Sequence, residues 1–598
     1  MTKTTHRMPC RATTSARPAP RLRAILGLAT LVAGASVVAE PALARDPSSL
    51  RDLEIPVSRV PDWHPMDNLP LDTSSWTRVD IPCNGGDGAA LQARFDAATP
   101  NTVLMLPANC RFRVPGTLFL RRSNVVLRGA SRTTSILEFQ ELDREMLNVI
   151  IPAFPANEPY GNPRGWTAGF TTGTQVLTVA NTSGMTVGGW VRMTANTEPD
   201  WHVQAKNQYA AKLVCVGATG GSQCSGLSSN QIRIDRGLPS PFTQGGQFVE
   251  PMTGQYLRNV GIENVRFEHA NWTRVEQYRS YVEMEDCYEC WVTDSIFGNG
   301  GNSHIGLKDT VRTVFRGNDM GINQCTDGGV TCQWNKGAIY FNQGTADNVF
   351  ENNTLTQSPS GPNSQGGSGN VIAYNFMQAD SSVECERHVF LHGQGTTATL
   401  AEGNDVDCMM QWDSHRDGQG YNNTFYRNRL RGVGNRVGGY QRGRLGGEDT
   451  GSHIHRFITV IGNHVNELMG SPQMTGRAID ESADATHRHQ DTWVTHNVAR
   501  REILFETSGQ QVRTTQYENH IRNDPNPGWS NFDFPASLYR TEAPPWWCEE
   551  SGAFPNIGAP SDRLGNYSKL PAQIRLEGGT CTTRTGTNNP LPAPIFLE

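Results

Sequence analysis

Polar and apolar positions in the second half of the chain follow one short recurring phrase: an apolar residue, two or three variable residues, an asparagine and another apolar residue. The asparagines of this phrase are Asn318, Asn353, Asn375, Asn404, Asn428, Asn463, Asn497 and Asn519. Their spacing varies from 22 to 35 residues, as expected for one structural unit whose loops differ in length. Single units of this kind cannot bury their own apolar face, so the pattern predicts a solenoid of stacked rungs.

Between the asparagines lie several short runs of β type, which turns rich in Gly, Asn and Asp separate from one another. Helical periodicity is scarce, so the chain is predicted to be all-β. Asparagine tolerates a left-handed backbone and bonds turn groups with its amide. We therefore assign the recurring asparagines a structural role and exclude them from the candidate catalytic residues.

The N-terminal part contains a Gly85–Gly86–Asp87–Gly88 turn, then a stretch that places Leu91, Phe95 and Ala98 on one face of a short helix, then a strand at 102–114. This order resembles the entry of secreted pectate-lyase-like right-handed parallel β-helices, in which the helix caps the open end of the solenoid. Residues 124–139 match the first complete rung of that superfamily. A cap is needed because an open end would expose strand edges and apolar interior.

A second stretch, 392–428, is similar to a segment of an exported β-helix subgroup of that superfamily. The matching positions are His392–Gly393, Glu402–Gly403–Asn404, Asp413 and Asn423–Thr424–Phe425, and 537–547 resembles the terminal segment of the subgroup. The arginine-containing signatures of true pectate lyases and the paired-aspartate motifs of polygalacturonases are not recognisable. The resemblance therefore implies an architecture rather than a particular substrate.

Together these patterns predict an all-β, right-handed parallel β-helix with an N-terminal capping helix and a small β insertion. The expected parts are a signal peptide at 1–44, a cap and entry segment at 45–123, first rungs at 124–150, an inserted β subdomain at 151–250, the main β-helix at 251–524 and a C-terminal capping tail at 525–598. The tail contains two Pro and two Trp at 544–547, which either pack over the last rung or form an aromatic sugar platform.

The first 44 residues combine a basic stretch, an apolar run at 24–39 and a small-x-small cleavage pattern at 42–44. This order is typical of a secretory signal; the alternative, a membrane anchor, would need a longer and more apolar run. We expect a secreted or periplasmic protein that is not membrane-bound after cleavage. Its net charge of −6 argues against non-specific nucleic-acid binding, and we expect a monomer that acts on a polysaccharide.

The chain has 13 cysteines, of which Cys10 lies in the predicted signal, so an even number remains for an oxidising compartment. Plausible pairs are Cys83 with Cys110, Cys215 with Cys224, Cys325 with Cys332, Cys385 with Cys408 and Cys548 with Cys581. Cys287 and Cys290 form a lone CxxC, for which a disulfide is favoured because a zinc site would need a second pair.

Aligning the rungs on their asparagines places four upstream strands in register, and their outward positions then form a column of polar residues. The column contains Lys308, Asn342, His392 and Ser414, with His415 next to it, and its flanks carry His304, Lys336, Arg387, His388, Asp413 and Arg416. This is the densest collection of titratable side chains in the repeats. An exposed solenoid face is polar by necessity, so the alternative is a merely solvated surface.

Positive groups beside a base suit β-elimination on a uronate polymer, because the proton next to a carboxylate is removable only when the carboxylate is neutralised. His392 or His415 is the candidate base, and Lys308, Arg387 or Arg416 the candidate neutraliser. A hard cation such as Ca²⁺ could replace the neutraliser, with Glu402, Asp405, Asp407 and Asp413 as oxygen ligands. No other cofactor is implied.

The Gly-rich loop at 431–456 carries Arg442 and Arg444 and is either a substrate clamp or a plain surface loop. The sequence thus predicts an exported polysaccharide lyase. The alternatives are a glycoside hydrolase using two carboxylates as acid and base, and a non-catalytic carbohydrate-binding solenoid.

Overall fold

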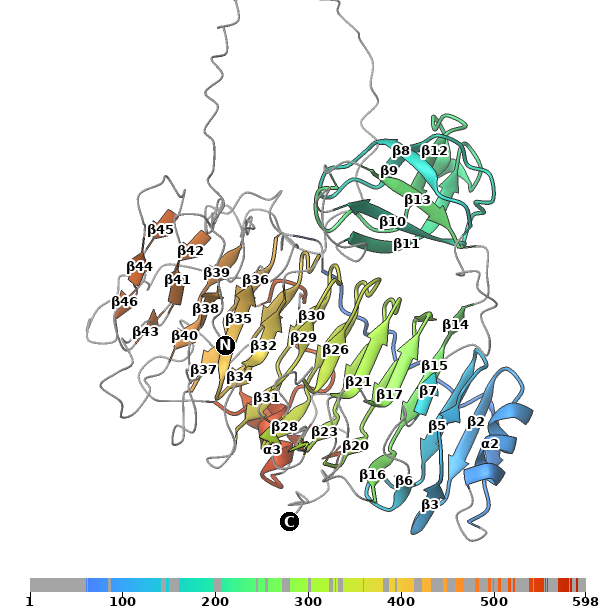
Figure 1. Ribbon diagram of the computed structural model, residues 1–598, viewed down its shortest axis with the longest axis vertical. Helices are drawn as coiled ribbons and strands as arrows, with labels where there is room; N and C mark the ends of the chain where they lie inside the picture. The colour runs from blue at the N-terminus through green and yellow to red at the C-terminus, as the bar shows by residue number, and fades with distance from the viewer. Residues whose placement is uncertain are drawn as a thin grey trace, which may run out of the picture. The chain divides into compact units, whose positions relative to one another are not determined.

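Three long parallel sheets form the body of the protein in a computed structural model (Figure 1). The residues that the structure describes are 61, 63–83, 88–140, 147–149, 161–196, 206–242, 246–252, 256–270, 280–299, 303–321, 326–327, 330–331, 337–358, 360–379, 387–392, 395–413, 422–431, 445–448, 458–465, 479–482, 493–495, 498–499, 504–506, 515–517, 520–521, 537–540, 542–552, 554, 557, 568–579, 581–582 and 588–589. The predicted signal peptide lies outside them.

The first sheet has 13 strands, and each pairs in parallel with the strands of the rungs before and after it. Its strands are β1 (Thr77–Asp80), β2 (Thr102–Leu106), β5 (Val125–Gly129), β15 (Val260–Glu263), β19 (Trp291–Thr293), β22 (Val314–Arg316), β27 (Val349–Glu351), β30 (Val371–Ala373), β33 (Leu400–Glu402), β36 (Thr424–Tyr426), β39 (Thr459–Ile461), β42 (Trp493–Thr495) and β45 (Thr515–Tyr517).

The second sheet has 12 strands and follows the first in each rung after a tight turn. Its strands are β3 (Cys110–Val114), β6 (Ser135–Phe139), β16 (Arg266–His269), β20 (Ile296–Phe297), β23 (Asp319–Met320), β28 (Thr354–Thr356), β31 (Phe376–Gln378), β34 (Asp405–Val406), β37 (Arg429–Leu430), β40 (His464–Val465), β43 (Val498–Ala499) and β46 (His520–Ile521).

The third sheet has 11 strands and completes each rung. Its strands are β4 (Leu118–Phe119), β7 (Leu147–Val149), β17 (Ser280–Glu285), β21 (Ser303–Lys308), β26 (Ile339–Phe341), β29 (Asn363–Ser364), β32 (Arg387–Leu391), β35 (Met409–Asp413), β38 (Leu445–Glu448), β41 (Ile479–Ser482) and β44 (Leu504–Glu506). The fold is therefore a right-handed parallel β-helix, as predicted.

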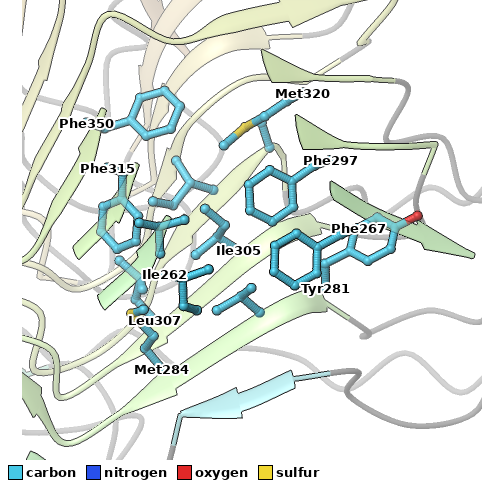
Figure 2. Close-up of a cluster of buried hydrophobic side chains, with 14 of the residues drawn as sticks. Ile262, Phe267, Tyr281, Met284, Phe297, Ile305, Leu307, Phe315, Met320 and Phe350 are labelled. Carbon is cyan, nitrogen blue, oxygen red and sulfur yellow. The ribbon is translucent and has the colours of Figure 1, made fainter. Parts of the chain in front are cut away.

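The interior is filled by alternate residues of the strands, because successive side chains of a strand point to opposite faces. Ile305 and Leu307 of β21 are fully buried among residues of all three sheets (Figure 2). Like residues stack on like along the solenoid: the rings of Phe267 and Phe297 lie 4.9 Å apart and nearly parallel. One continuous apolar core thus connects the rungs.

The capping helix α2 (Gly88–Ala97) closes the N-terminal end of this core. Leu91 and Phe95 are buried against strand residues, and Ala98, just after the helix, is buried with them. The predicted apolar face of the helix is confirmed.

The recurring asparagines form a hydrogen-bonded ladder at the turn between the first and second sheets. Asn375 is fully buried, and its Nδ2 donates to the carbonyl of Phe350 at 2.9 Å and to Oδ1 of Asn404 at 3.0 Å. Its own Oδ1 accepts from the backbone N–H of Asn353 at 2.9 Å. The same pattern links Asn318, Asn353, Asn375, Asn404, Asn428 and Asn463. The predicted structural role of these six is confirmed, while Asn497 and Asn519 of the same phrase lie outside the described residues.

The insertion is a closed antiparallel barrel in the order β10, β11, β12, β9, β8, β13. Its strands are β8 (Arg164–Ala168), β9 (Val176–Val179), β10 (Trp190–Asn196), β11 (Lys206–Val216), β12 (Gln231–Ile234) and β13 (Phe248–Pro251). The short pairs β14 (Leu257–Arg258) with β18 (Cys287–Tyr288), β24 (Thr326–Asp327) with β25 (Val330–Thr331), and β47 (Cys581–Thr582) with β48 (Asn588–Asn589), together with helix α3 (Pro571–Leu576) and the 3₁₀ turns Ser222–Cys224 and Glu549–Ser551, complete the elements.

The barrel packs against the corner at which the third sheet passes into the first. Arg312 of this corner bonds both carboxylate oxygens of Asp235, at 2.5 and 2.9 Å. The barrel residue Trp190 lies 4.9 Å from the ring of Tyr288, and Tyr209 donates its hydroxyl to Asp347 at 3.0 Å. These hydrogen bonds and ring contacts join the barrel to the rungs.

Two terminal segments cover the outer face of the first sheet. The indole N–H of Trp63 donates to the carbonyl of Ala398 at 2.6 Å, and Arg540 pairs with both Asp67 and Glu351. Trp547 is fully buried against Tyr374, so this part of the C-terminal tail packs on the sheet rather than presenting an aromatic platform.

Four predicted cysteine pairs are confirmed as disulfides, namely Cys83–Cys110, Cys215–Cys224, Cys287–Cys290 and Cys548–Cys581. Cys408 is also disulfide-bonded. Its predicted partner Cys385 and the predicted pair of Cys325 with Cys332 lie outside the described residues. Within the described ranges, no helix has the length and apolarity needed to cross a membrane.

The hydrogen bonds of the asparagine ladder predict that replacing one of its asparagines lowers the stability of the protein strongly. Asn375→Ala removes a buried amide and leaves the carbonyl of Phe350 and the N–H of Asn353 without their partners, which should lower the free energy of unfolding by about 2–4 kcal/mol. Thermal or urea unfolding followed by circular dichroism measures this. The matched control, Asn181→Ala at an exposed turn of the barrel, should change stability by less than about 0.5 kcal/mol. Equal effects of the two variants would contradict a stabilising role of the ladder.

Candidate functional site

The predicted polar column lies on the outer face of the third sheet, at the ends of its strands. Leu307 pairs with Phe341, and Ser364 pairs with Leu391, so the residues that follow them continue the same register. Leu391 pairs with Trp412, which brings Asp413 rather than Ser414 next to His392. We call the residues Glu285, Lys308, Asn342, Gln365, His392 and Asp413 the strand-end column.

Gln365 is a member of this column that the sequence did not reveal, and it adds one rung between Asn342 and His392. Neighbouring strands are about 4.8 Å apart, so three rungs place the backbones of Lys308 and His392 roughly 14 Å apart. The two residues share one flank of the solenoid, but they cannot act on the same bond of a substrate.

The side chains of the column are partly open to solvent. Lys308 is about half exposed and forms an ion pair with Glu285. Burial alone would lower the pKa of Lys308, but the hydrogen bond and charge of Glu285 outweigh it and raise that pKa. The imidazole of His392 lies against the ring of Phe390, with ring centres 4.7 Å apart. Arg387 also lies over the ring of Phe390, at 4.3 Å.

A second outward row lies two residues earlier on the same strands. We call Glu283, Gly306, Tyr340, Asn363 and Phe390 the mid-strand row. Tyr340 donates its hydroxyl to Oε1 of Gln365. Burial raises the pKa of Tyr340 and the charge of Glu283 raises it further, so the phenol keeps its proton.

Two predicted histidines are buried and belong to the packing of the rungs. His304 stacks on Tyr281, with ring centres 6.1 Å apart, and burial lowers the pKa of His304 to about 4. His388 bonds the carbonyl of Ser358 through Nε2 at 3.1 Å, and its Nδ1 accepts the N–H of Cys408 at 3.3 Å. Neither imidazole faces solvent.

The carboxylates proposed as cation ligands are engaged with other groups. Asp405 pairs with Arg429 at 2.9 Å and with Arg431 at 2.6 Å, and Asp407 pairs with Arg431 at 3.2 Å. Glu402 lies on a different sheet, where it accepts from the hydroxyl of Tyr374 and from the N–H of Leu538 at 2.7 Å. The structure therefore does not bring the three together, and no metal-binding group of three or more His, Cys, Asp or Glu side chains occurs among the residues it describes.

Five predicted site residues lie outside the described residues, and the structure gives only the backbone position of Asp413. The five are His415, Arg416, Lys336, Arg442 and Arg444. The described part of the site consists of the strand-end column and the mid-strand row.

Asp286 is a titratable residue of this region that the sequence did not single out. It is buried at the corner beside the column, in a left-handed conformation, and its Oδ1 has no hydrogen-bond partner. Burial raises the pKa of Asp286 to about 8, and the neighbouring Asp309 and Glu285 contribute. Arg192 of the barrel pairs with Asp309 at 3.2 Å and with Glu250 at 2.8 Å. The barrel thus borders the column at Lys308.

Comparison with known proteins finds similar solved structures but no relatives in sequence. No protein-family model matches the chain, and no curated protein matches it. The tailspike protein gp49 of Pseudomonas phage LKA1 is similar with a TM-score of 0.47 and 11% identity, over 69% of this chain and 63% of the tailspike.

Two enzymes are also similar. Alginate lyase AlyF-OU02, solved in complex with G6, has a TM-score of 0.36 and 11% identity, over 74% of each chain. The catalytic unit of the GH87 α-1,3-glucanase from Streptomyces thermodiastaticus has a TM-score of 0.32 and 11% identity, over 73% of this chain and 64% of the enzyme. At these values the similarities carry no argument about activity.

The raised pKa of Asp286 predicts that the stability of the protein falls as the pH rises. The carboxyl of Asp286 keeps a proton in the folded state up to about pH 8 but releases it near pH 4 when unfolded, so stability falls by up to about 1.4 kcal/mol per pH unit between these values. Asp286→Asn removes this loss, and Asn tolerates the left-handed backbone. Unfolding midpoints should therefore be similar near pH 4 and higher for the variant at pH 8. Asp96→Asn, on α2, is the control; a variant that follows the parent across the whole range would contradict the assignment.

Proposed function

We propose that the protein is an exported, pectate-lyase-like polysaccharide lyase that cleaves a uronate-containing glycan by β-elimination on the outer face of the third sheet. The observation that carries the proposal is the placement of Tyr340 on β26, and of Gln365 and His392 directly after β29 and β32, on the outer side of three successive strands of this sheet. The disulfides support an oxidising compartment outside the cytoplasm.

The three residues fit the two proton transfers of the reaction. The imidazole of His392 accepts the proton from the carbon next to the uronate carboxylate, and the electron pair left behind forms the new C=C bond as the C–O bond to the leaving sugar breaks. Tyr340, whose raised pKa keeps it protonated, gives its proton to the leaving oxygen. Solvent then reprotonates the phenolate and takes the proton from the imidazolium.

The amides of Gln365 and Asn342 supply donors for the substrate carboxylate, which favours removal of the neighbouring proton. Lys308 stands too far from His392 for this task, so we assign it to another sugar residue of the polymer. Arg387, which lies over the same Phe390 ring as His392, stays a candidate for neutralising the carboxylate. A hard cation such as Ca²⁺ beside Asp413 would strengthen the neutralisation, since carboxylate oxygens are its preferred ligands.

A glycoside hydrolase is the second candidate, favoured by the acidic residues of β17. Glu283 and Glu285 project from the same face of this strand, and the pKa of the adjacent Asp286 is raised to about 8, as a proton-donating carboxylic acid requires. A carbohydrate-binding solenoid without activity is the third. The products distinguish all three.

The test is incubation of the purified protein with a panel of neutral and uronate polysaccharides. A lyase gives unsaturated products that absorb in the near ultraviolet and are lighter than hydrolytic products by one water. New reducing ends without this absorbance would indicate the hydrolase, and binding without products the solenoid; either result contradicts the proposal.

Tyr340→Phe removes the proposed proton donor and should lower kcat by about 10²–10⁴ with little change in the unfolding midpoint. Tyr256→Phe, at the barrel corner, is the matched control and should keep the parent rate. Full activity of Tyr340→Phe, or of His392→Ala, would remove these residues from the mechanism.

A further inference from the structure

The mid-strand row has a composition that differs from that of the strand-end column. The column carries two carboxylates, a lysine, two amides and an imidazole, whereas the row carries one carboxylate, that of Glu283, the amide of Asn363 and the rings of Tyr340 and Phe390. One row residue stands on each successive rung, about 4.8 Å from the next. The two lines therefore offer different chemistry to a polymer lying on the sheet.

Gly306 determines the position of the Glu283 carboxylate. It pairs in register with Glu283 on one side and with Tyr340 on the other. A Cβ at Gly306 would overlap the carboxylate group of Glu283, because that group lies over the glycine. The missing side chain thus lets the carboxylate reach across one rung towards Tyr340, and its charge is felt there in the raised pKa of the phenol.

Asn363 supplies a second acceptor in the same row. About nine-tenths of the residue is buried, yet its Oδ1 has no hydrogen-bond donor. A buried acceptor without a donor costs free energy that a bound donor recovers. Tyr340 precedes Asn363 in the register and Phe390 follows it, so an aromatic ring lies on either side of this acceptor along the solenoid.

Tyr340 and Phe390 are each less than a tenth exposed, and Arg387 and His392 lie against the Phe390 ring, so the rings wall the acceptor rather than form an open stacking face. An acceptor in such a place complements a sugar hydroxyl, since hydroxyls donate. A sugar carboxylate placed here would bring a negative charge towards Glu283, which is unfavourable in a partly buried place.

We propose that the mid-strand row is a subsite for an uncharged, hydroxyl-bearing sugar residue, anchored by Asn363 and Glu283. The inference rests on the proposed function, and it narrows the substrate class to a heteropolymer in which a neutral sugar adjoins the uronate. Gly306 is a positioning residue in this arrangement, because it acts only through Glu283.

Calorimetric binding to two probes tests the subsite without requiring turnover. The first probe is an oligosaccharide of alternating galacturonate and rhamnose, and the second is an oligogalacturonate of equal length. The parent protein should bind the alternating probe at least about tenfold more tightly, a difference of about 1.4 kcal/mol. Equal affinity, or a preference for the oligogalacturonate, would overturn the proposal.

Two variants locate the effect. Gly306→Ala displaces only the flexible end of Glu283, so the fold should persist while affinity for the alternating probe falls about tenfold. Asn363→Ala should lower the affinity for the alternating probe by a similar factor and leave the affinity for the oligogalacturonate unchanged. Gly165→Ala in the barrel, where an added Cβ meets no close neighbour, is the control.

The unfolding midpoint of each variant is measured alongside, and unchanged affinity in a folded Gly306→Ala and a folded Asn363→Ala would refute the subsite. Failure of the proposed function has a different signature. Binding of the alternating probe that depends on Asn363, without any cleavage, would overturn the lyase but uphold the subsite.

Discussion

The buried amide of the ladder asparagine is the interaction on which the rest of the molecule depends. Each rung must turn sharply from the first sheet into the second, and the turn buries backbone groups that water cannot reach. Asn375 and its equivalents bond the turns of the neighbouring rungs through both amide atoms. This fixes the vertical register of the rungs, and the register in turn aligns the outward residues of the third sheet into straight lines.

The site described above is a product of this alignment. Tyr340, Gln365 and His392 come from rungs that are separate in sequence, and the parallel pairing of their strands and the hydrogen bond from Tyr340 to Gln365 bring them together. The barrel contacts the corner that follows these strands, where Arg312 pairs with Asp235 and Asp347 pairs with Arg236. Shifting one rung by a single residue would turn its contribution from the outer face into the core.

The fold class could be predicted because its determinants are local and repeated. The asparagine phrase, the strand alternation and the apolar face of the capping helix are each legible in a few residues. The column was harder: its rung at Gln365 has a two-residue strand, Asn363–Ser364, with no apolar residue to mark it. An alignment of rungs made from the sequence alone omits this rung, and Gln365 with it. At the last rung of the column the sequence alignment was also wrong by one residue, because it placed Ser414 beside His392 where the structure has Asp413.

Burial explains most of the remaining differences. Alternation puts His304 on the same side as Lys308, but rings from neighbouring strands cover His304, and this depends on residues distant in sequence. The spacing of charged residues in the sequence does indicate the ion pairs of Asp405 and Asp407. Asp405 and Arg429 each follow their ladder asparagine by one residue, and Asp407 and Arg431 each follow theirs by three, so these two pairs could have been read from the rung alignment.

The packing of the two terminal segments on the outer face of the first sheet has a consequence for folding during synthesis. Trp63 reaches a rung more than three hundred positions later, and Asp67 meets Arg540 near the far end of the polypeptide. During synthesis the outer face of the first sheet around Tyr374 and Tyr426 must therefore stay without its C-terminal cover until the last segment emerges. Apolar surface exposed during that interval is prone to aggregation, and it is the kind of surface that chaperones shield on a growing chain.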